Sequence, residues 1–250
     1  MARVALVTGA GQGVGRGVAE VLAASGFVVL VNDLHRDRAE ETVRGLRDAG
    51  GEAVAAPFDV TVRPEIDEAL ASLVPQIGPV DILVNNAGVP EAYEPAPLLS
   101  SDPERWMSPV ALNLFGSMHC IQAVGPGMVE RGWGRIVQIS SGTASFGRNI
   151  GVSLYAGSKA AIEGVIRHLA AEIGSSGVTA NALALGLMEN AATSPAAADI
   201  GIERLVADVP LQRFGKMREV GAAVRWLVSE DAGFVTGQVI HLNGGQLNGR

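Results

Sequence analysis

The chain has little charge and few aromatic residues for its length. Of its 250 residues, 18% are charged and 4% are aromatic, whereas 48% are hydrophobic. A disordered chain shows the opposite balance of charge and hydrophobicity, so we expect one large folded core. The net charge is −7 at pH 7, and no block of basic residues occurs. We therefore expect no nucleic-acid partner, because such a partner requires a basic face.

Cysteine is almost absent. Cys120 is the only one, which excludes an intrachain disulfide and fits a reducing compartment. No stretch approaches 18 apolar residues without a glycine or a charge, so no membrane span is expected. The first apolar run is too short for a signal peptide. Histidine, cysteine and carboxylate residues do not show the spacing of metal ligands. We expect a cytoplasmic protein without a metal site.

Short β-branched runs alternate with longer helical patterns along the chain. The runs are mostly apolar, which is typical of strands buried on both faces of a parallel sheet. The alternation predicts a single α/β domain over residues 1–250 with a doubly wound parallel sheet. The expected strands are residues 3–8, 27–32, 52–58, 81–86, 135–140, 178–183 and 238–243. The expected helices are residues 14–25, 36–49, 63–76, 103–130, 154–173 and 217–229.

A glycine-rich loop follows the first expected strand. Its sequence, VTGAGQGVGRG, has the spacing T-G-x-x-x-G-x-G from Thr8 through Gly9 and Gly13 to Gly15. Bare backbone lets a pyrophosphate approach, and the following helix N-terminus supplies N–H donors and a positive dipole. Without a G-K-S/T ending, the loop does not fit a P-loop. Asp33 ends the second strand, where a carboxylate can bind the ribose of an adenosine. Loop and aspartate together predict nucleotide binding and leave NAD and S-adenosylmethionine as alternatives.

Further motifs occur in order along the rest of the chain. They are Asp59 in FDV, residues 85–88 (NNAG), Asn113 in ALNLFG, residues 140–142 (SSG), and then Tyr155 with Lys159. In this order the chain resembles the short-chain dehydrogenase/reductase family, from TGAGQGVG to the C-terminal FVTGQVIHLNGG. A methyltransferase has no role for the tyrosine–lysine pair or for NNAG. The resemblance therefore favours a nicotinamide cofactor.

The resemblance implies a Rossmann-type sheet of seven parallel strands in the order 3-2-1-4-5-6-7, with the cofactor across the C-terminal strand ends. It also implies a homotetramer, or a homodimer, packed through the helices near 103–130 and 154–173. The catalytic residues would be Asn113, Ser141, Tyr155 and Lys159. The cofactor-binding residues would be Gly9, Gln12, Gly13, Val14, Gly15, Asp33, Asp59, Val60, Asn86, Ala87, Gly88, Tyr155, Lys159, Gly186, Met188 and Asn190.

The tyrosine and the lysine have a chemical reason to share one helix face. Hydride transfer to a ketone leaves charge on oxygen, so a proton donor must lie beside it. A free tyrosine, with a pKa of about 10, is a poor base at neutral pH in the reverse direction. An ammonium four residues along the helix favours the phenolate, so we expect Lys159 to lower the pKa of Tyr155. By the resemblance, Ser141 would orient the substrate oxygen and Asn113 would link Lys159 to solvent.

The chain departs from the family pattern near the nicotinamide end. Ser141 precedes the catalytic tyrosine by 14 residues, one more than the usual spacing, so Ser140 is the second choice and Ser153 a weak third. Leu185 stands where the family usually has a proline, which restores an N–H group and loosens the backbone. Asn190 stands where the family often has a threonine, and its amide can both donate and accept hydrogen bonds.

Cofactor choice follows from the charge at the end of the second strand. The carboxylate of Asp33 would repel the 2′-phosphate of NADP, and the loop before Gly13 offers Gln12 rather than a cation. His35 and Arg36 lie nearby and oppose this effect. We expect NAD(H), preferred by at least roughly tenfold.

The substrate is expected to lie between two segments that are poor in cations. Residues 187–208 would form a lid, and residues 89–106 a second wall. Anion sites recruit Arg or Lys, so these walls favour a neutral, largely apolar secondary alcohol or ketone. The alternative is a 3-oxoacyl thioester, carried on acyl carrier protein or CoA, with Arg131 and Arg135 as the candidate anion patch. A non-catalytic nucleotide-binding sensor is the alternative from another class.

Overall fold

A computed structural model describes residues 2–89, 93–147, 150–189 and 201–246. It contains one sheet whose strands all pair in parallel, in the order β3-β2-β1-β4-β5-β6-β7. This confirms the doubly wound α/β fold and the strand order that the sequence predicts. The strands are β1 Val4–Val7, β2 Val28–Val31, β3 Glu52–Ala55, β4 Val80–Asn85, β5 Gly134–Ser141, β6 Val178–Leu185 and β7 Val239–Leu242.

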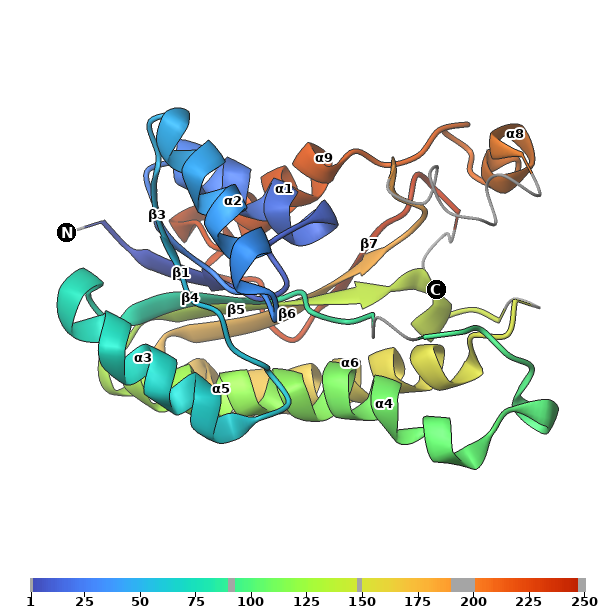
Figure 1. Cartoon of the computed structure of the whole chain (residues 1–250), viewed down its shortest axis with the longest axis horizontal. Helices are drawn as coiled ribbons and strands as arrows, with labels where there is room; N and C mark the ends of the chain where they lie inside the picture. The colour runs from blue at the N-terminus through green and yellow to red at the C-terminus, as the bar shows by residue number, and fades with distance from the viewer. Residues whose placement is uncertain (1, 90–92, 148–149, 190–200, 247–250) are drawn as a thin grey trace.

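Helices cover both faces of the sheet (Figure 1). One layer holds α1 Gly13–Ala24, α2 Arg36–Asp48 and α9 Met217–Leu227. The other holds α3 Arg63–Ile77, α4 Met107–Val110, α5 Ser117–Glu130 and α6 Ser153–Ile173. The short elements are η1 Leu98–Ser100, η2 Pro103–Arg105, η3 Ala111–Gly116, η4 Gly142–Ala144, η5 Gly174–Ser176, α8 Ile202–Val206 and η7 Glu230–Ala232. In the described part of the chain, no helix combines the length and apolarity needed to cross a bilayer.

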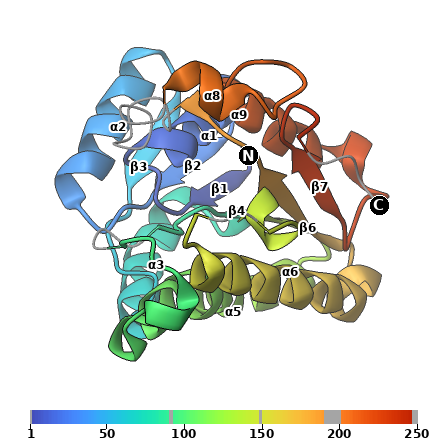
Figure 2. The same cartoon turned by 90° about the vertical axis from the view of Figure 1, so that its right-hand side faces the viewer.

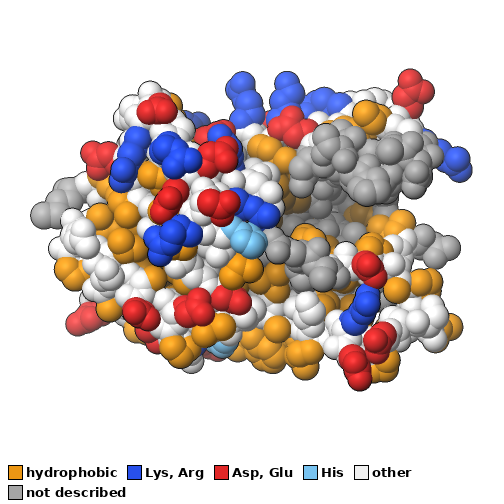
Figure 3. All heavy atoms as spheres, in the orientation of Figure 1, with side chains coloured by type: hydrophobic (Ala, Val, Ile, Leu, Met, Phe, Trp, Pro, Cys, Tyr) orange, Lys and Arg blue, Asp and Glu red, His pale blue; other side chains and the backbone are white. Residues whose placement is uncertain are grey.

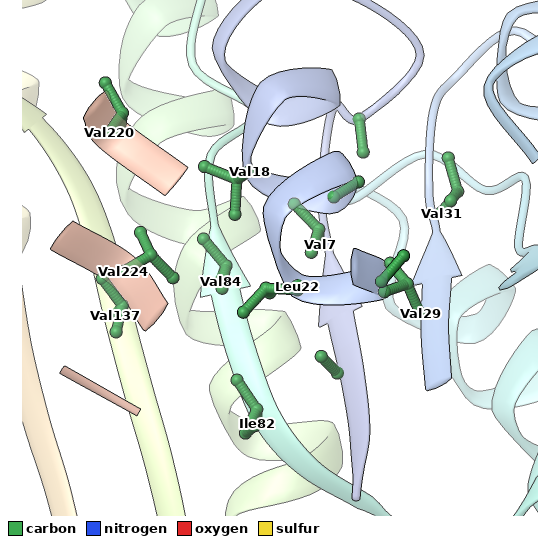
Figure 4. Close-up of a cluster of buried hydrophobic side chains, with 14 of the residues drawn as sticks. Val7, Val18, Leu22, Val29, Val31, Ile82, Val84, Val137, Val220 and Val224 are labelled. Atoms are coloured by element: carbon green, nitrogen blue, oxygen red, sulfur yellow. The ribbon is translucent and has the colours of Figure 1, made fainter. Parts of the chain in front are cut away.

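The strands read as continuous apolar runs because each face of the sheet has its own core. Val7 and Leu22 belong to the core beneath α1 and α9, which Figure 4 shows, whereas Leu6 belongs to the core beneath α5 and α6. All three side chains are completely buried. Burying a side chain of this size contributes about 1.5–3 kcal/mol. Alternation along one strand therefore fills two cores, and neither face of the strand can be polar.

The parallel topology brings the C-terminal ends of the strands to one edge of the sheet (Figure 2). The chain winds from β1 outward to β3 and then returns to β4 on the other side of β1. The loop after β1 therefore leads to one side of the sheet and the loop after β4 to the other side. A crevice is expected between these two loops. Ligands of doubly wound folds bind at such a switch point.

The prediction of one continuous helix over residues 103–130 is wrong, because the segment is interrupted. The segment divides into the 3₁₀ turn η2, the short helix α4, the π-helical turn η3 and then α5. A π-helical turn holds one residue more than an α-helical turn, and such turns are frequent at functional sites. Asn113 lies inside this turn.

Candidate active site

A cavity of about 600 Å³ opens at the C-terminal edge of the sheet. This volume is within the range of small-molecule and cofactor sites, and the molecule is hollowed on that side in Figure 3. Most of the residues singled out from the sequence line it. They are Gly9, Gln12, Gly13, Val14, Asp33, Asp59, Val60, Asn86, Ala87, Gly88, Ser141, Tyr155, Lys159, Gly186 and Met188.

The glycine-rich loop is held open by hydrogen bonds from neighbouring strands. The hydroxyl of Thr8 accepts the N–H groups of Asn86 (2.9 Å) and Ala87 (3.1 Å), and the Asn86 amide donates to the Thr8 carbonyl at 2.8 Å. Gly9 and Gly13 have φ values of +60° and +55°, which disfavour other residues. The loop therefore presents bare backbone and the N-terminus of α1 to the cavity, which suits a pyrophosphate.

Gly15 has a different place from the one expected, because it does not line the cavity. It is buried behind the loop, where a Cβ atom would collide with the Gly9 carbonyl oxygen and lie 2.5 Å from the Asn86 amide nitrogen. Its role in this structure is close packing of α1 against the loop. This packing sets the position of the helix N-terminus, and Gly15 contributes to the site only in that way.

Asp33 lies at the far end of the cavity with both carboxylate oxygens engaged. One oxygen accepts the N–H of Gly11 at 3.0 Å and the other accepts the N–H of His35 at 3.1 Å. The side chain is 6% exposed, and it lines the cavity together with Arg38. A carboxylate fixed in this way can accept hydrogen bonds from a ribose diol. Its charge opposes a phosphate at the same place.

Arg38 is a cavity residue that the sequence analysis missed. Arg36, the arginine expected near this end from the sequence, is 72% exposed and pairs with Glu40 at 3.7 Å. Arg38 precedes Thr42 by one helical turn, and the Thr42 hydroxyl donates to the Gly11 carbonyl at 3.2 Å. The inward face of α2 therefore points Arg38 at the glycine-rich loop. Apolar residues recur at helical spacing over residues 39–46, so the sequence indicates which face of this helix is buried and that Arg38 borders this face.

Asp59 and Val60 border the cavity beside the loop after β3. The Asp59 carboxylate accepts both the N–H and the hydroxyl of Thr61, each at 2.8 Å. The carbonyl of Val60 lies 3.2 Å from a ring nitrogen of His119. These contacts fix the turn that follows β3 at the edge of the cavity.

Tyr155 and Ser141 are brought together by the first turn of α6 and the end of β5. The two hydroxyl groups lie close enough for Ser141 to affect the ionisation of the phenol, and the Ser141 hydroxyl accepts that of Thr143 at 2.9 Å. Burial raises the pKa of Tyr155; hydrogen bonding by the Ser141 hydroxyl opposes this rise and the nearby Tyr93 adds to it. The expected lowering of this pKa by Lys159 is therefore wrong for this arrangement, because desolvation outweighs it.

Ser140 and Ser153 do not meet Tyr155 in this way. The Ser140 hydroxyl points to the other side of β5 and donates to the carboxylate of Glu163 at 2.5 Å. Ser153 is exposed at the start of α6. Of the three serines, Ser141 is the one whose hydroxyl interacts with the phenol.

Lys159 is completely buried one turn along α6 from Tyr155. Its ammonium nitrogen lies 5.7 Å from the centre of the Tyr155 ring and donates to the carbonyl of Ile139 at 2.9 Å. Burial lowers the pKa of Lys159 to about 8, and the negative charge of Glu163 limits this fall. The charge on this ammonium is therefore sensitive to its surroundings near neutral pH.

Asn113 is completely buried near the lysine and, unlike Lys159, does not line the cavity. Its amide nitrogen donates to the Pro109 carbonyl at 3.0 Å and to the Ser158 hydroxyl at 3.1 Å. Its oxygen is buried and has no hydrogen-bond partner among the described residues. A Cβ atom at Gly88 would lie 2.6 Å from the Lys159 nitrogen and 2.8 Å from this oxygen. Because Gly88 has no side chain, the Lys159 ammonium and the Asn113 amide oxygen can both lie against its backbone.

The expected lid is described only in part. Met188 lines the cavity and forms a β-bridge with Gly215. Near the end of the segment, Ile202–Val206 form the short helix α8. Residues 190–200, with Asn190, lie outside the described residues. Leu185 ends β6, and the N–H of Gly186 donates to the Leu242 carbonyl at 3.0 Å. Leu185 thus lies in a regular strand, paired with Leu242, and not in a loosened loop.

The chain is similar to known proteins over nearly its whole length. The model of the family described as enoyl-(acyl carrier protein) reductase matches residues 9–246. A 3-oxoacyl-(acyl-carrier-protein) reductase FabG of Staphylococcus epidermidis is 35% identical over 246 residues, which are 98% of this chain and 99% of that protein.

Two solved structures have similar folds and carry different cofactors. A gluconate 5-dehydrogenase from Burkholderia cenocepacia, in complex with NADP and tartrate, aligns with a TM-score of 0.87 and 32% identity over 98% of this chain and 94% of that chain. A 3-oxoacyl-(acyl-carrier protein) reductase from Brucella melitensis with bound NAD aligns with a TM-score of 0.87 and 33% identity over 97% of this chain and 90% of that chain.

Proposed function

The chain belongs to the short-chain dehydrogenase/reductase family, and we propose that it interconverts a ketone and a secondary alcohol with a nicotinamide cofactor. The observation that carries this proposal is the convergence of Tyr155, Ser141 and the buried ammonium of Lys159 on one cavity, with the ammonium 5.7 Å from the centre of the Tyr155 ring. A sensor on the same fold would have no use for this arrangement. Turnover with any ketone or alcohol therefore separates the two functions.

The cavity has the features that a nicotinamide cofactor requires. Its loop presents bare backbone and a helix N-terminus, and Asp33 offers a fixed carboxylate at the opposite end from Tyr155. When bound, the cofactor would supply or accept the hydride.

Each catalytic side chain has a defined part in moving the proton. Tyr155 donates its phenolic proton to the substrate oxygen in reduction and removes it in oxidation, and Ser141 holds that oxygen by a hydrogen bond. Lys159 stabilises the phenolate, while Asn113 fixes the π-helical turn beside the ammonium. Proton transfer by a positioned side chain contributes about 10²–10⁴-fold to the rate. The raised pKa of Tyr155 keeps the phenol protonated near neutral pH, which is the form that reduction requires.

We propose NAD(H) as the preferred cofactor. The carboxylate of Asp33 is almost completely buried and fixed by two N–H groups, so it cannot turn away from a 2′-phosphate. Arg38 lies at the same end of the cavity and reduces the repulsion. We expect kcat/KM for NADH to exceed that for NADPH by at least roughly tenfold. Equal use of the two cofactors would overturn this choice.

The substrate that the relatives favour is a 3-oxoacyl thioester. The Staphylococcus epidermidis reductase matches this chain over nearly its whole length, and a 3-oxo carbonyl is a ketone that Tyr155 and Ser141 can bind. Arg131 and Arg135 are not the anion patch expected for such a carrier. They lie at the opposite edge of the sheet, where Arg131 pairs with Asp81 at 3.3 Å and the buried Arg135 faces Glu230 at 3.6 Å.

The second candidate is a neutral, largely apolar ketone. Arg105, in the wall before α4, pairs with Glu94 at 2.7 Å, and Arg213 is held by Glu219 at 2.8 Å. Cations paired in this way offer little to a phosphate or carboxylate. Tyr93 adds an aromatic ring 6.1 Å from that of Tyr155.

A substrate panel followed by NADH absorbance separates the candidates. The panel holds a 3-oxoacyl-CoA, neutral cyclic and aliphatic ketones, and a sugar acid. A thioester kcat/KM more than about tenfold above the ketones, equivalent to ~1.4 kcal/mol in the transition state, supports the thioester. The reverse order supports the neutral ketone. Absence of turnover with every compound, together with tight NADH binding, would favour the sensor.

The proposed assembly is a homotetramer, or a homodimer, in the cytoplasm. Phe115 and Met118 are exposed apolar side chains on η3 and α5, the face through which the family is expected to pack. Light scattering during size-exclusion chromatography measures the mass directly. A monomer at micromolar concentration would contradict this part of the proposal.

A further inference from the structure

Glu163 is a buried carboxylate that the proton transfer described above does not use. Its side chain is 5% exposed, and the hydroxyl of Ser140, itself 2% exposed, donates to it at 2.5 Å. A buried charge is costly unless it is paired and hydrogen-bonded. The hydrogen bond from Ser140 therefore offsets part of the cost of burying a charged Glu163.

The position of Glu163 connects it to the catalytic pair. It follows Lys159 by four residues and Tyr155 by eight, and residues four apart share one face of a helix. The face that carries the phenol and the ammonium therefore also carries the carboxylate. Ser140, its hydrogen-bond partner, lies next to Ile139, whose carbonyl accepts the Lys159 ammonium at 2.9 Å. Lysine and glutamate are thus tied to consecutive residues of β5.

Other charges are remote from this pair. Among the described elements whose backbones come closest to α6, which are α4, η3, η4, η5, β5 and β6, the one charged side chain is Arg135. On α5, in the same layer, the ring of His119 faces the Val60 carbonyl at 3.2 Å and Glu130 is exposed. Arg135 lies near the start of β5, roughly 16 Å along the strand from Ser140 at ~3.3 Å per residue, and it faces Glu230. On α6 itself, Arg167 and His168 are exposed. Tyr93 contacts the ring of Tyr155, at the other end of the group.

We propose that Glu163 is a positioning residue, which with Ser140 fixes a negative charge beneath Lys159 and thereby keeps that lysine protonated and facing Tyr155. The inference rests on the proposed function, since it assigns Glu163 a part in the same proton transfer. Without the carboxylate, the ammonium would keep the Ile139 carbonyl as an acceptor but lose the opposite charge on its helix face, and its proton would be lost at lower pH. A neutral lysine could not stabilise the phenolate.

The composition of the chain makes a direct test possible. Its lysines are Lys159 and Lys216, so lysine labelled with ¹³C at Cε gives one resonance for each. The variant Lys216→Arg assigns the Lys159 signal. A pH titration of that signal measures the charge of Lys159 without substrate or turnover. A failure of the proposed function therefore leaves this measurement intact, and the two outcomes are distinguishable.

The decisive comparison uses three substitutions on α6. Glu163→Gln keeps the size of the side chain and removes the charge, and we expect the midpoint for Lys159 to fall by roughly 1 pH unit or more. Glu163→Asp keeps the charge and should restore most of this loss. Glu172→Gln makes the same chemical change at an exposed position of the same helix and should leave the midpoint unchanged. Far-UV circular dichroism of each variant shows whether α6 remains folded.

A second measurement connects the charge to the reaction. In ketone reduction by Glu163→Gln, the fall of kcat at high pH should begin at lower pH than in the wild type, by a similar amount. A purely structural role would lower kcat at all pH values and leave the midpoint in place. An unchanged Lys159 midpoint in folded Glu163→Gln would overturn the proposal. So would an equal shift in Glu172→Gln.

Discussion

Gly88→Ala is the substitution for which the structure gives the sharpest expectation. The new Cβ atom would lie 2.6 Å from the ammonium nitrogen of Lys159 and 2.8 Å from the amide oxygen of Asn113. Contacts shorter than 3.0 Å are essentially never made by real Cβ atoms, and about 3.4 Å is ordinary. The lysine must therefore move by ~0.8 Å, or the backbone must move instead, because a packed interior does not absorb such overlaps freely.

The surroundings of Lys159 determine where this displacement goes. Its nitrogen donates to the Ile139 carbonyl at 2.9 Å, so a shift away from Gly88 weakens that bond or disturbs Tyr155. Asn113 cannot yield easily, because two hydrogen bonds hold its amide nitrogen. A misplacement of about 1 Å costs roughly 10²-fold in rate, which is ~2.7 kcal/mol at 1.36 kcal/mol per tenfold. We expect kcat to fall by about this factor.

The measurement is steady-state ketone reduction by the wild type, Gly88→Ala and a control. Gly174→Ala is the control, because its φ of −58° suits alanine and no atom lies within 4 Å of the added Cβ. Thermal unfolding should show a loss of about 1–3 kcal/mol for Gly88→Ala from overpacking, and little change for the control. A kcat for folded Gly88→Ala within threefold of the wild type would refute the reasoning.

Three further predictions concern the same cavity. Tyr155→Phe should bind NADH normally and lose about 10²–10⁴-fold in kcat; an active variant within a few-fold of the wild type would remove Tyr155 from the mechanism. Asp33→Ala should narrow the preference for NADH over NADPH, and an unchanged ratio of the two kcat/KM values would show that another residue selects the cofactor. Burial lowers the pKa of Lys159 from 10.5 to about 8, so between these values the unfolded chain binds more protons and Lys159 destabilises the fold less as the pH rises. The free energy of unfolding of the wild type, measured in urea relative to Lys159→Met, should therefore increase from pH 8 to pH 10, and a constant difference would show that Lys159 is not desolvated.

The order of the strands could be predicted because local and global signals agree. Apolar runs such as VALV and VVLV are too hydrophobic for a strand with a solvated face, and the alternation with helices restricts the sheet to a parallel one. The place of the cavity follows from the strand order, since parallel strands put their C-terminal ends at one edge. The strand order and the place of the cavity can therefore be predicted from periodicity and topology alone, without side-chain detail.

The π-helical turn at Asn113 could not be predicted from its residues. ALNLFG contains ordinary helix-compatible side chains, and no local signal marks an extra residue. The turn is a matter of packing, because Gly116 lies against Val60, whose side chain would be 2.8 Å from an added Cβ atom. Arg38 is a different case, since the apolar face of α2 points it inward and the sequence contains that information.

The direction of the Tyr155 pKa shows most clearly what the spacing of residues omits. A tyrosine and a lysine four residues apart predict that the two groups are neighbours, and they are. The prediction of a lowered pKa assumed that Coulomb attraction is the largest effect, whereas burial raises the pKa of the phenol and lowers that of the ammonium. Desolvation acts on both groups in favour of their neutral forms. The ion pair that the mechanism requires is thus opposed by the burial that brings its members together, and an additional fixed charge, such as the carboxylate of Glu163, is what the site needs to retain the proton on Lys159.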